Sequence, residues 1–373
     1  MKNIPSILLT TFLIIVLFSD SFSEERMPTE PHTNSTHPLS LPITGFCVKG
    51  FEDFDKKLVK YLTARGFSGA TLAIIKDGKF LVKRGYGWSN KNTTKPMLPD
   101  DFLRIASLTK IVTAIAIKHL IQNKKITYET KAIDFLGGTQ TILDPDINKI
   151  TIANLLFHQG GWNTDRTLDP LLSLDMVTSK LKKNASDLMP NDILKYALEN
   201  TKLDFMPATN TKYSNLGFTL LGRIIEKASK TSYLNFINSI ICKPLNAQIE
   251  IGPSKLSHKS SSEIEFYKSN DLTLDNDSIS LKAADSTFGL ITSAPNLCKI
   301  LDKYWIDGDK RTTGEQRQLL KTGTLPGTTA LARQRYSGAS IVVLINSRDN
   351  NNPEMDNNKL KQLIDNLANK CGI

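Results

Sequence analysis

The chain has 373 residues, of which 40% are hydrophobic and 23% charged, with 21 glycines and 16 prolines. This length and composition suit one large or two small domains with an ample core, and they exclude a fibrous or largely disordered chain. The formal net charge is +10, yet the lysines are scattered and no basic run is interleaved with aromatic residues, so we expect no nucleic acid partner. A weak preference for an anionic surface, such as a cell wall, or for an anionic substrate stays open.

The N-terminal residues predict a leader rather than part of the fold. Lys2 is followed by an apolar run at 7–18 and by small residues at 21–23, which is the pattern of a secretory signal peptide over residues 1–23. The run is shorter than the roughly 20 residues of a membrane span, with an uncleaved signal anchor as the alternative. We therefore expect a secreted or periplasmic protein without a transmembrane span after signal removal. Residues 24–46, rich in Pro, Thr and Ser, predict a flexible mature N-terminus.

The four cysteines are Cys47, Cys242, Cys298 and Cys371, and none has the CxxC spacing of a zinc or redox site. Four cysteines in an exported chain predict two disulfides. Because Cys47 precedes the first expected helix and Cys371 ends the last one, we expect these two to pair, which leaves Cys242 for Cys298. The two other connectivities and free buried thiols stay open.

In chain order, the first expected element is a helix at 51–65, which Gly66 ends. Two strands at 70–76 and 79–85 flank Asp77-Gly78, which is typical of a type I′ hairpin. From Ile111 to Ile121 the apolar residues fall on nearly all sides, which predicts a helix buried in the core.

The rest of the chain predicts a helical middle and a β-rich end. Residues 163–190 are polar and predict a surface excursion, and the polar residues 251–285 predict a long loop at the rim of a cleft. Helices are expected at 150–157, 192–199, 216–228, 233–241, 295–300 and 355–367, and strands at 318–324, 328–335 and 339–345.

These elements predict an α+β fold, an α/β sandwich. Its antiparallel sheet is built from the N- and C-terminal segments and flanked by the terminal helices, with a mostly helical lobe beside it. We expect one catalytic domain over 47–373, with an α/β lobe at 47–100 and 318–373 and a helical lobe at 101–317. A cleft between the lobes is then the expected site.

Three short motifs lie in or beside these predicted elements. Ser107 and Lys110 lie one helical turn apart at the start of the buried helix, so they share a face. Tyr213 and Asn215 lie in a loop before a helix, where residues two apart point the same way. The triplet Lys-Thr-Gly at 321–323 occurs once, in an expected strand.

Each motif alone is weak. A second Ser-x-x-Lys match lies at 179–182 in a charged segment, and a second Tyr-x-Asn match lies at 233–235 inside an expected helix. The signal is the order of the three motifs and their placement. As plain structural residues, Ser107 would be a helix cap, Lys110 a solvated lysine and Tyr213 a core aromatic.

The chain resembles the serine β-lactamases and D-Ala-D-Ala peptidases, most closely the branch of class C β-lactamases and D,D-carboxypeptidases, which also contains esterases. The three motifs carry the resemblance, which extends from about residue 50 to the C-terminus and implies a β-lactamase/transpeptidase-like fold. The chain departs from the family pattern at 158–161 (His-Gln-Gly-Gly for His-Thr-Ser-Gly), at 207–209 (Pro-Ala-Thr for Pro-Gly-Thr) and in a short stretch between Ile300 and Lys321.

The chemistry of these residue types is acyl transfer. The Ser107 hydroxyl needs a base at neutral pH. Lys110 can serve if burial and a neighbouring cation such as Lys321 lower its pKa, and Tyr213 can serve if the same cations stabilise its phenolate. Which of the two takes the proton stays open. Water activated near Tyr213 would then release the acyl group.

The resemblance also implies how the substrate is held. The oxyanion would be bound by backbone N–H groups of Ser107 and Thr324. Asn215 would hold Lys110 and a substrate amide, and Lys321 and Thr322 would receive a substrate carboxylate. The expected catalytic residues are Ser107, Lys110 and Tyr213, and the expected substrate-binding residues are Asn215, Lys321, Thr322, Gly323 and Thr324.

We expect no cofactor and no metal, because the five histidines are scattered without metal spacing. His158 is interpreted as structural. The sequence thus predicts an exported serine hydrolase that acts on a peptide, β-lactam or ester carbonyl of a small-molecule or peptide substrate. Lys321 favours a substrate that bears a carboxylate. The alternatives are a carboxylesterase of the same fold and a catalytically inactive binding or scaffold homologue.

Overall fold

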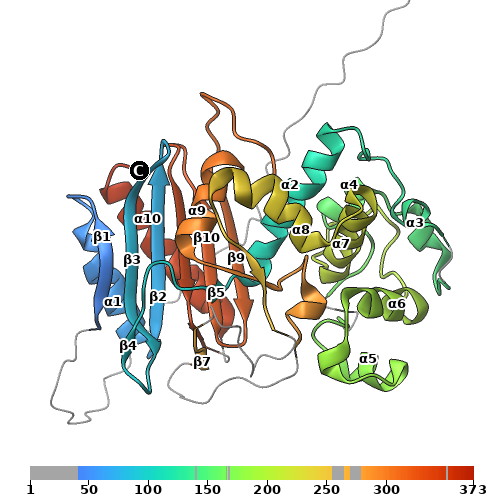
Figure 1. Ribbon diagram of the computed structural model, residues 1–373, viewed down its shortest axis with the longest axis horizontal. Helices are drawn as coiled ribbons and strands as arrows, with labels where there is room; N and C mark the ends of the chain where they lie inside the picture. The colour runs from blue at the N-terminus through green and yellow to red at the C-terminus, as the bar shows by residue number, and fades with distance from the viewer. Residues whose placement is uncertain are drawn as a thin grey trace, which may run out of the picture. The chain divides into compact units, whose positions relative to one another are not determined.

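Strands from both ends of the chain meet in one antiparallel sheet, with blue N-terminal strands beside orange and red C-terminal ones in Figure 1. The computed structural model describes residues 41–138, 141–164, 166, 169–253, 264–268, 279–349 and 352–373. Within this part the strand order is β1-β3-β2-β11-β10-β9, with β4 paired to β3. The strands are β1 Ile43–Cys47, β2 Gly69–Lys76, β3 Lys79–Asn90, β4 Lys95–Pro96, β9 Leu319–Leu325, β10 Thr328–Gln334 and β11 Ser340–Ile345.

The join between the two ends is the pairing of β2 with β11. It runs antiparallel from Ala70 opposite Ile345 to Ile75 opposite Ser340. The predicted hairpin is also present, because Asp77 and Gly78 have φ of 51° and 74°, the left-handed values that a type I′ turn requires. The predicted fold class is therefore confirmed.

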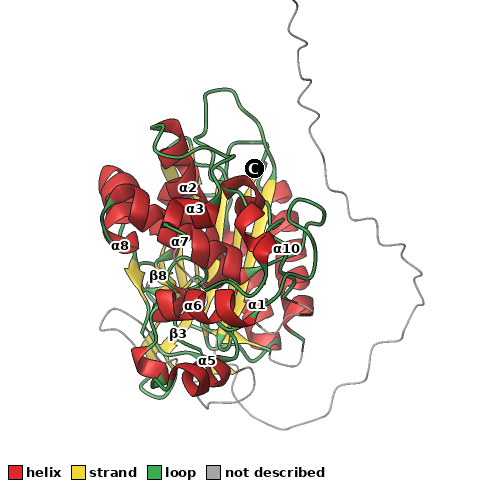
Figure 2. Cartoon of the chain, turned by 90° about the vertical axis from the view of Figure 1, so that its right-hand side faces the viewer, coloured by secondary structure: helices red, strands yellow, loops and turns green. Residues whose placement is uncertain are grey.

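Alternating side chains give the sheet two buried faces. Leu72 and Ile74 pack with helices α1 (Glu52–Ala64) and α10 (Pro353–Lys370). Ala73 and Ile75 point the other way, into the larger core shared with the remaining helices. Figure 2, the view turned by 90°, shows α1 and α10 on one side of the yellow strands.

Strand β1 corrects one expectation. Residues 43–46 were expected to belong to a flexible N-terminus, but they form an edge strand in which Ile43 lies opposite Tyr86 and Cys47 opposite Val82. Short strands on sheet edges carry a weak apolar signal, which is why this one was missed. The expected leader at 1–23 and residues 24–40 lie outside the described part of the chain.

Helix α9, Ala294–Lys303, differs from the expected lobe division. The sequence places it in the helical lobe, but it packs on β2 and β11. Leu297, Cys298, Ile300 and Leu301 are buried along one stripe of this helix. That stripe covers the sheet face opposite α1 and α10, as an amphipathic helix on a sheet does.

The remaining helices contribute to the larger core. The helices of three or more turns are α2 Thr109–Gln122, α6 Pro190–Asn200 and α7 Asn215–Ser229, and the shorter ones are α3 Ala132–Leu136, α4 Ile152–Leu156, α5 Leu174–Leu181 and α8 Tyr233–Ile237. Helix α2 is buried on nearly every side, as predicted, and packs against α7 and α8. Short 3₁₀ or π segments lie at Ala106–Leu108, Pro145–Lys149, Ala185–Asp187, Asn238–Cys242, Lys243–Leu245 and Lys282–Ala284. Minor strands are β5 Leu103–Arg104, β6 Glu250–Ile251, β7 Tyr267–Lys268, β8 Leu290–Thr292 and β12 Ser347–Arg348.

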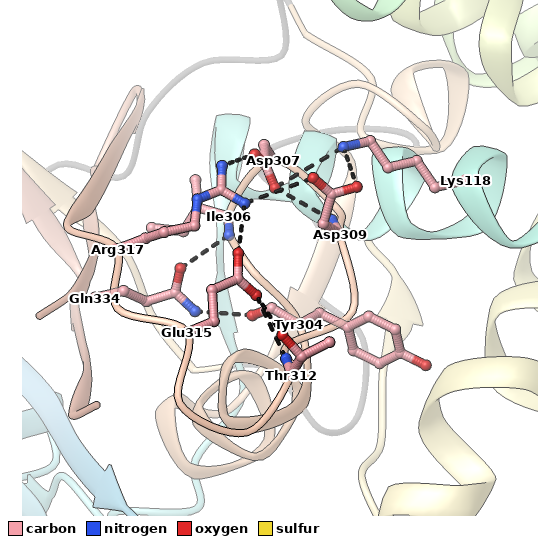
Figure 3. Close-up of polar contacts among 9 residues, drawn as sticks. All are labelled: Lys118, Tyr304, Ile306, Asp307, Asp309, Thr312, Glu315, Arg317 and Gln334. Carbon is pink, nitrogen blue, oxygen red and sulfur yellow. Dashed lines mark hydrogen bonds and ion pairs between the residues drawn. The ribbon is translucent and has the colours of Figure 1, made fainter. Parts of the chain in front are cut away.

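The short connection from α9 to β9 is fastened to α2, as Figure 3 shows. Lys118 Nζ on α2 donates to Asp309 Oδ1 at 2.6 Å, and Arg317 pairs with both Asp307 and Asp309. A Cβ on Gly308 would lie 2.7 Å from the backbone carbon of Ala114, so the connection touches the helix backbone itself. The start of β9 is thereby fixed relative to α2.

The predicted disulfides are absent, because all four cysteines are free thiols. Cys298 Sγ donates to the carbonyl groups of Ala73 and Ser340 inside the core. Cys371 Sγ donates to the carbonyl of Gly50. The expected pairs Cys47–Cys371 and Cys242–Cys298 were therefore wrong. Among the described residues, no helix combines the length and apolarity needed to cross a membrane.

Candidate active site

Ser107 lies in the 3₁₀ turn Ala106–Leu108, directly before α2. Ala106 has φ of 48°, a left-handed value that is strained for a residue with a Cβ. Strand β9 runs against this turn, since a Cβ on Gly323 would lie 2.9 Å from both Ser107 N and Ile105 O. Glycine in the Lys-Thr-Gly triplet is thus required by the close approach of two backbones.

Lys110 is buried under the serine, with an exposed fraction of 1%. Its Nζ donates to Asn215 Oδ1 at 2.8 Å and to the Thr287 carbonyl at 2.9 Å, and lies 3.5 Å from Ser107 Oγ. Burial lowers the pKa of Lys110 to about 7, and Asp169 opposes this shift. A substantial fraction of the amine is therefore neutral near pH 7.

Tyr213 makes the shortest contact to the serine: its Oη lies 2.7 Å from Ser107 Oγ. The Nζ atoms of Lys110 and Lys321 lie 4.9 Å and 5.9 Å from the centre of its ring. Although 41% of the residue is exposed along the cleft, burial of its hydroxyl is the largest influence and raises the pKa of Tyr213. Lys321 and the hydrogen bond to Ser107 lower the same pKa, but by less.

The segment 158–161, where the chain departs from the family pattern, braces the loop that ends at Tyr213. The His158 ring lies 4.7 Å from the Tyr213 ring, and its Nδ1 accepts the backbone N–H of Ser214 at 3.3 Å. The carbonyl of His158 accepts the N–H of Lys212 at 2.8 Å. Burial, followed by Lys321 and Lys110, lowers the pKa of His158 to about 3, so the ring is neutral at physiological pH.

Strand β9 forms one wall of a cleft of about 460 Å³. Burial lowers the pKa of Lys321 to about 8, Tyr213 opposes the shift and Lys110 adds to it. Within the described part of the chain, no carboxylate pairs with Lys321. The residues that line the cleft are Ser107, Thr164, Leu172, Tyr213, Asn215, Phe288, Leu320, Lys321, Thr322, Gly323, Thr324, Leu325 and Asn357.

The structure thus brings all eight predicted residues together. Seven of them line the cleft, and Lys110 lies behind Ser107 and Asn215. This arrangement can pass a proton from the serine hydroxyl to a neutral amine or a phenolate, and it places a cation where an anionic group can enter.

Sequence reasoning missed other residues that contact the site. Asp169 is 6% exposed, and its Oδ2 accepts from Asn215 Nδ2 at 2.6 Å. Thr164 donates to the Tyr213 carbonyl through its N–H at 3.2 Å and its Oγ1 at 2.9 Å. Thr287 acts through its backbone carbonyl, which has no sequence signature. The sequence predicts that 163–190 is a surface excursion, and this was wrong for Thr164 and Asp169, which contact the site.

No group of three or more His, Cys, Asp or Glu side chains that could hold a metal ion occurs among the described residues.

The family model described as Beta-lactamase matches residues 54–343, and the chain belongs to this family. The predicted resemblance is therefore confirmed. Its members are mostly serine hydrolases.

Curated relatives match part of the chain. A probable fimbrial assembly protein FimD of Dichelobacter nodosus is 34% identical over 148 residues, which are 39% of this chain and 34% of that protein. Protein flp of Staphylococcus aureus is 30% identical over 178 residues, 48% of this chain and 33% of that protein. The chain thus spans about a third of the length of these relatives.

Solved structures share the fold at low sequence identity. The D-amino acid amidase of Ochrobactrum anthropi, in complex with L-phenylalanine amide, has a TM-score of 0.65 at 18% identity and covers 85% of this chain and 98% of its own. FmtA of Staphylococcus aureus has a TM-score of 0.64 at 17% identity, covering 87% and 91%. The octameric penicillin-binding protein homologue of Pyrococcus abyssi has a TM-score of 0.62 at 20% identity, covering 79% and 73%.

Proposed function

We propose that the protein is a serine hydrolase that forms an acyl-enzyme through Ser107 on a peptide, β-lactam or ester carbonyl. One observation carries the proposal: Ser107 Oγ lies 2.7 Å from the Tyr213 hydroxyl and 3.5 Å from the Lys110 amine, at the wall of an open cleft. A nucleophile within reach of a base and of a proton donor is the arrangement that acyl transfer requires.

In this proposal Lys110 is the base. Its pKa of about 7 leaves a neutral amine available, whereas the raised pKa of Tyr213 keeps the phenol protonated. Ser107 Oγ attacks the substrate carbonyl while its proton passes to Lys110. The Tyr213 hydroxyl then donates a proton to the leaving group, and the proton held by Lys110 replaces it. Water hydrolyses the ester at Ser107 by the reverse sequence of proton transfers.

The negative charge on the substrate oxygen has two backbone donors in this proposal, the N–H groups of Ser107 and Thr324. The support is the close contact of β9 with the serine turn at Gly323, because it brings these two peptide groups to the same wall. Donors that are in place before the charge develops stabilise the transition state. The N-terminal end of α2 adds a positive dipole at the same point.

Substrates with a carboxylate suit this cleft best. Lys321 is a partly buried cation without a carboxylate partner in the described part of the chain, and Thr322 lies next to it on the cleft wall. Buried charges gain by pairing, which an anionic substrate group would provide. Leu172, Phe288 and Leu325 add apolar surface for the rest of the substrate.

Export through the leader-like residues 1–23 is part of the same proposal.

A matched set of substrates tests the function. We expect the wild-type protein to hydrolyse at least one of three compounds: a chromogenic cephalosporin, a peptide ending in D-Ala-D-Ala, or a short-chain ester. We expect Ser107→Ala to lose that activity. Preference for esters that carry a carboxylate over neutral esters of equal length would support the role of Lys321. Equal turnover by wild type and Ser107→Ala would refute the proposal.

A further inference from the structure

Asp169 stands behind the candidate site in a chain of three polar groups. Its Oδ2 accepts from Asn215 Nδ2 at 2.6 Å, and Asn215 Oδ1 in turn accepts from Lys110 Nζ at 2.8 Å. The other carboxylate oxygen accepts the N–H of Leu171 at 2.9 Å. Asp169, Asn215 and Lys110 are each more than nine-tenths buried. The sequence motifs do not include this aspartate.

The aspartate fixes the orientation of the Asn215 amide. A carboxylate only accepts hydrogen bonds and an ammonium only donates them, whereas an amide side chain has one end of each kind. The amide NH₂ must therefore face Asp169, and its oxygen must face Lys110. A flipped amide would set NH₂ against the lysine donor and oxygen against the carboxylate, which leaves both buried contacts repulsive.

Asp169 also supplies a negative charge where cations dominate. Lys110 on α2 and Lys321 on β9 are the cations, Tyr213 adds a protonated phenol, and His158 adds a neutral ring. Asp169 opposes the effect of burial on Lys110, so it holds the pKa of that amine higher than burial alone would. Burial is the largest influence on the pKa of Asp169 itself and raises it, while the hydrogen bond from Asn215 lowers it.

We propose that Asp169 is a positioning residue that acts through Asn215 to set the location and the charge state of Lys110. This inference extends the proposed function, because Lys110 is useful to Ser107 only when its amine points at the hydroxyl and can take a proton. Asp169 does not itself line the cleft, and it is connected to Lys110 through Asn215. Its contribution is the fixed amide and the buried charge.

A purely structural role is the competing explanation. Asp169 also accepts the N–H of Leu171 and so holds the turn at 169–172, where the N–H of Leu172 donates to the Asp169 carbonyl. Asp144 offers a matched control. Its two carboxylate oxygens accept the N–H groups of Asp146 and Leu203, and it has no contact with Lys110. Asp144→Asn removes the charge of a carboxylate that, like Asp169, accepts backbone N–H groups.

The deciding measurement is the titration of Lys110 in protein labelled with ¹³C and ¹⁵N in its lysines, followed by NMR and assigned by the signal lost in Lys110→Met. Asp169→Asn keeps the shape and can still accept from Asn215, but it removes the charge. We expect it to lower the pKa of Lys110 by about one unit, since an ammonium loses a nearby opposite charge. We expect Asp144→Asn to leave it unchanged. An unchanged Lys110 titration in Asp169→Asn would overturn the inference.

Acylation kinetics give the second readout. In Asp169→Asn the low-pH limb of the acylation rate should move to lower pH together with Lys110. Asp169→Leu, which leaves the Asn215 NH₂ buried without an acceptor, should slow acylation about tenfold or more. If Asp169→Leu does not fold, Asp169→Asn decides alone. If wild type does not acylate, the proposed function fails, but the titration needs no substrate and still tests Asp169.

Discussion

A Cβ on Gly323 would lie 2.9 Å from the backbone nitrogen of Ser107, so the edge strand β9 and the serine turn are in direct backbone contact. The contact places the two peptide groups that the proposal uses for the oxyanion on one wall of the cleft. It also ties the position of Lys321, two residues earlier on β9, to that of the serine.

Replacing Gly323 by alanine tests this contact. The added methyl group has to push β9 away from the serine turn, because the atoms it meets belong mainly to backbone. Displacements of about 1 Å near reacting groups cost roughly 100-fold in rate, and we expect a loss of that order in Ser107 acylation. Gly217→Ala is the control, since a Cβ there has ordinary contacts of 3.6 Å or more. Equal rates in the two variants would contradict the prediction.

Tyr213→Phe removes the hydroxyl that lies 2.7 Å from Ser107 Oγ and keeps the ring on His158. We expect acylation to slow by roughly 100-fold or more, the usual contribution of a positioned proton donor. The free energy of unfolding should change by less than about 1 kcal/mol, because the phenol lies along an open cleft. Stopped-flow acylation and urea unfolding measure the two effects, and full activity in the variant would exclude the proposed proton path.

The pH dependence of acylation follows from two lysines. Lys110 has to be neutral to accept the serine proton, so the rate should rise as pH increases through about 7. Lys321 has to be charged to hold a carboxylate, so the rate with such substrates should fall as pH increases through about 8. The profile of kcat/KM is then a narrow bell between these values.

Neutral esters provide the internal comparison for that profile. Without a substrate carboxylate the high-pH limb should weaken, while the low-pH limb stays in place. If the rate falls equally at high pH for both substrate types, Lys321 does not recognise the carboxylate.

The connection between α9 and β9 offers a test of stability. Gly308 has φ of 95°, and its missing Cβ would lie 2.7 Å from the backbone of Ala114. Gly314 in the same connection has φ of 82° but open space around it. Gly314→Ala should lower the free energy of unfolding by about 1 kcal/mol because of backbone strain. Gly308→Ala should lower it by the same amount and by roughly 1–3 kcal/mol more, because the methyl group clashes with α2. Chemical unfolding of both variants separates the two causes, and equal losses would contradict the docking of this connection on α2.

The main parts of the candidate site could be predicted from sequence, because each motif has a local cause. Ser107 and Lys110 lie one helical turn apart, Tyr213 and Asn215 lie where a loop enters α7, and the triplet at 321–323 lies on a strand. Hydrophobic periodicity predicted the buried helix α2 and the strands β2 and β11, whose pairing joins the two ends of the chain. The resemblance added the expectation that the three segments meet.

Other features depend on contacts between distant segments and left no local pattern. Asp169 lies in a polar stretch, and its hydrogen bond to Asn215 on α7 joins residues that are 46 positions apart in the chain. Thr287 contributes a backbone carbonyl, which any residue has. Cysteine pairing depends on distances between side chains, so the expected Cys47–Cys371 pair could not be tested by spacing alone.

Acylation of Ser107 is the most direct test of the proposed acyl-enzyme. The wild-type protein is incubated with a penicillin and analysed by intact-protein mass spectrometry, followed by mapping of the modified peptide. We expect a mass increase of one intact penicillin per chain, located on Ser107, and no increase in Ser107→Ala. Modification of another residue, or equal modification of both proteins, would contradict the proposed acyl-enzyme.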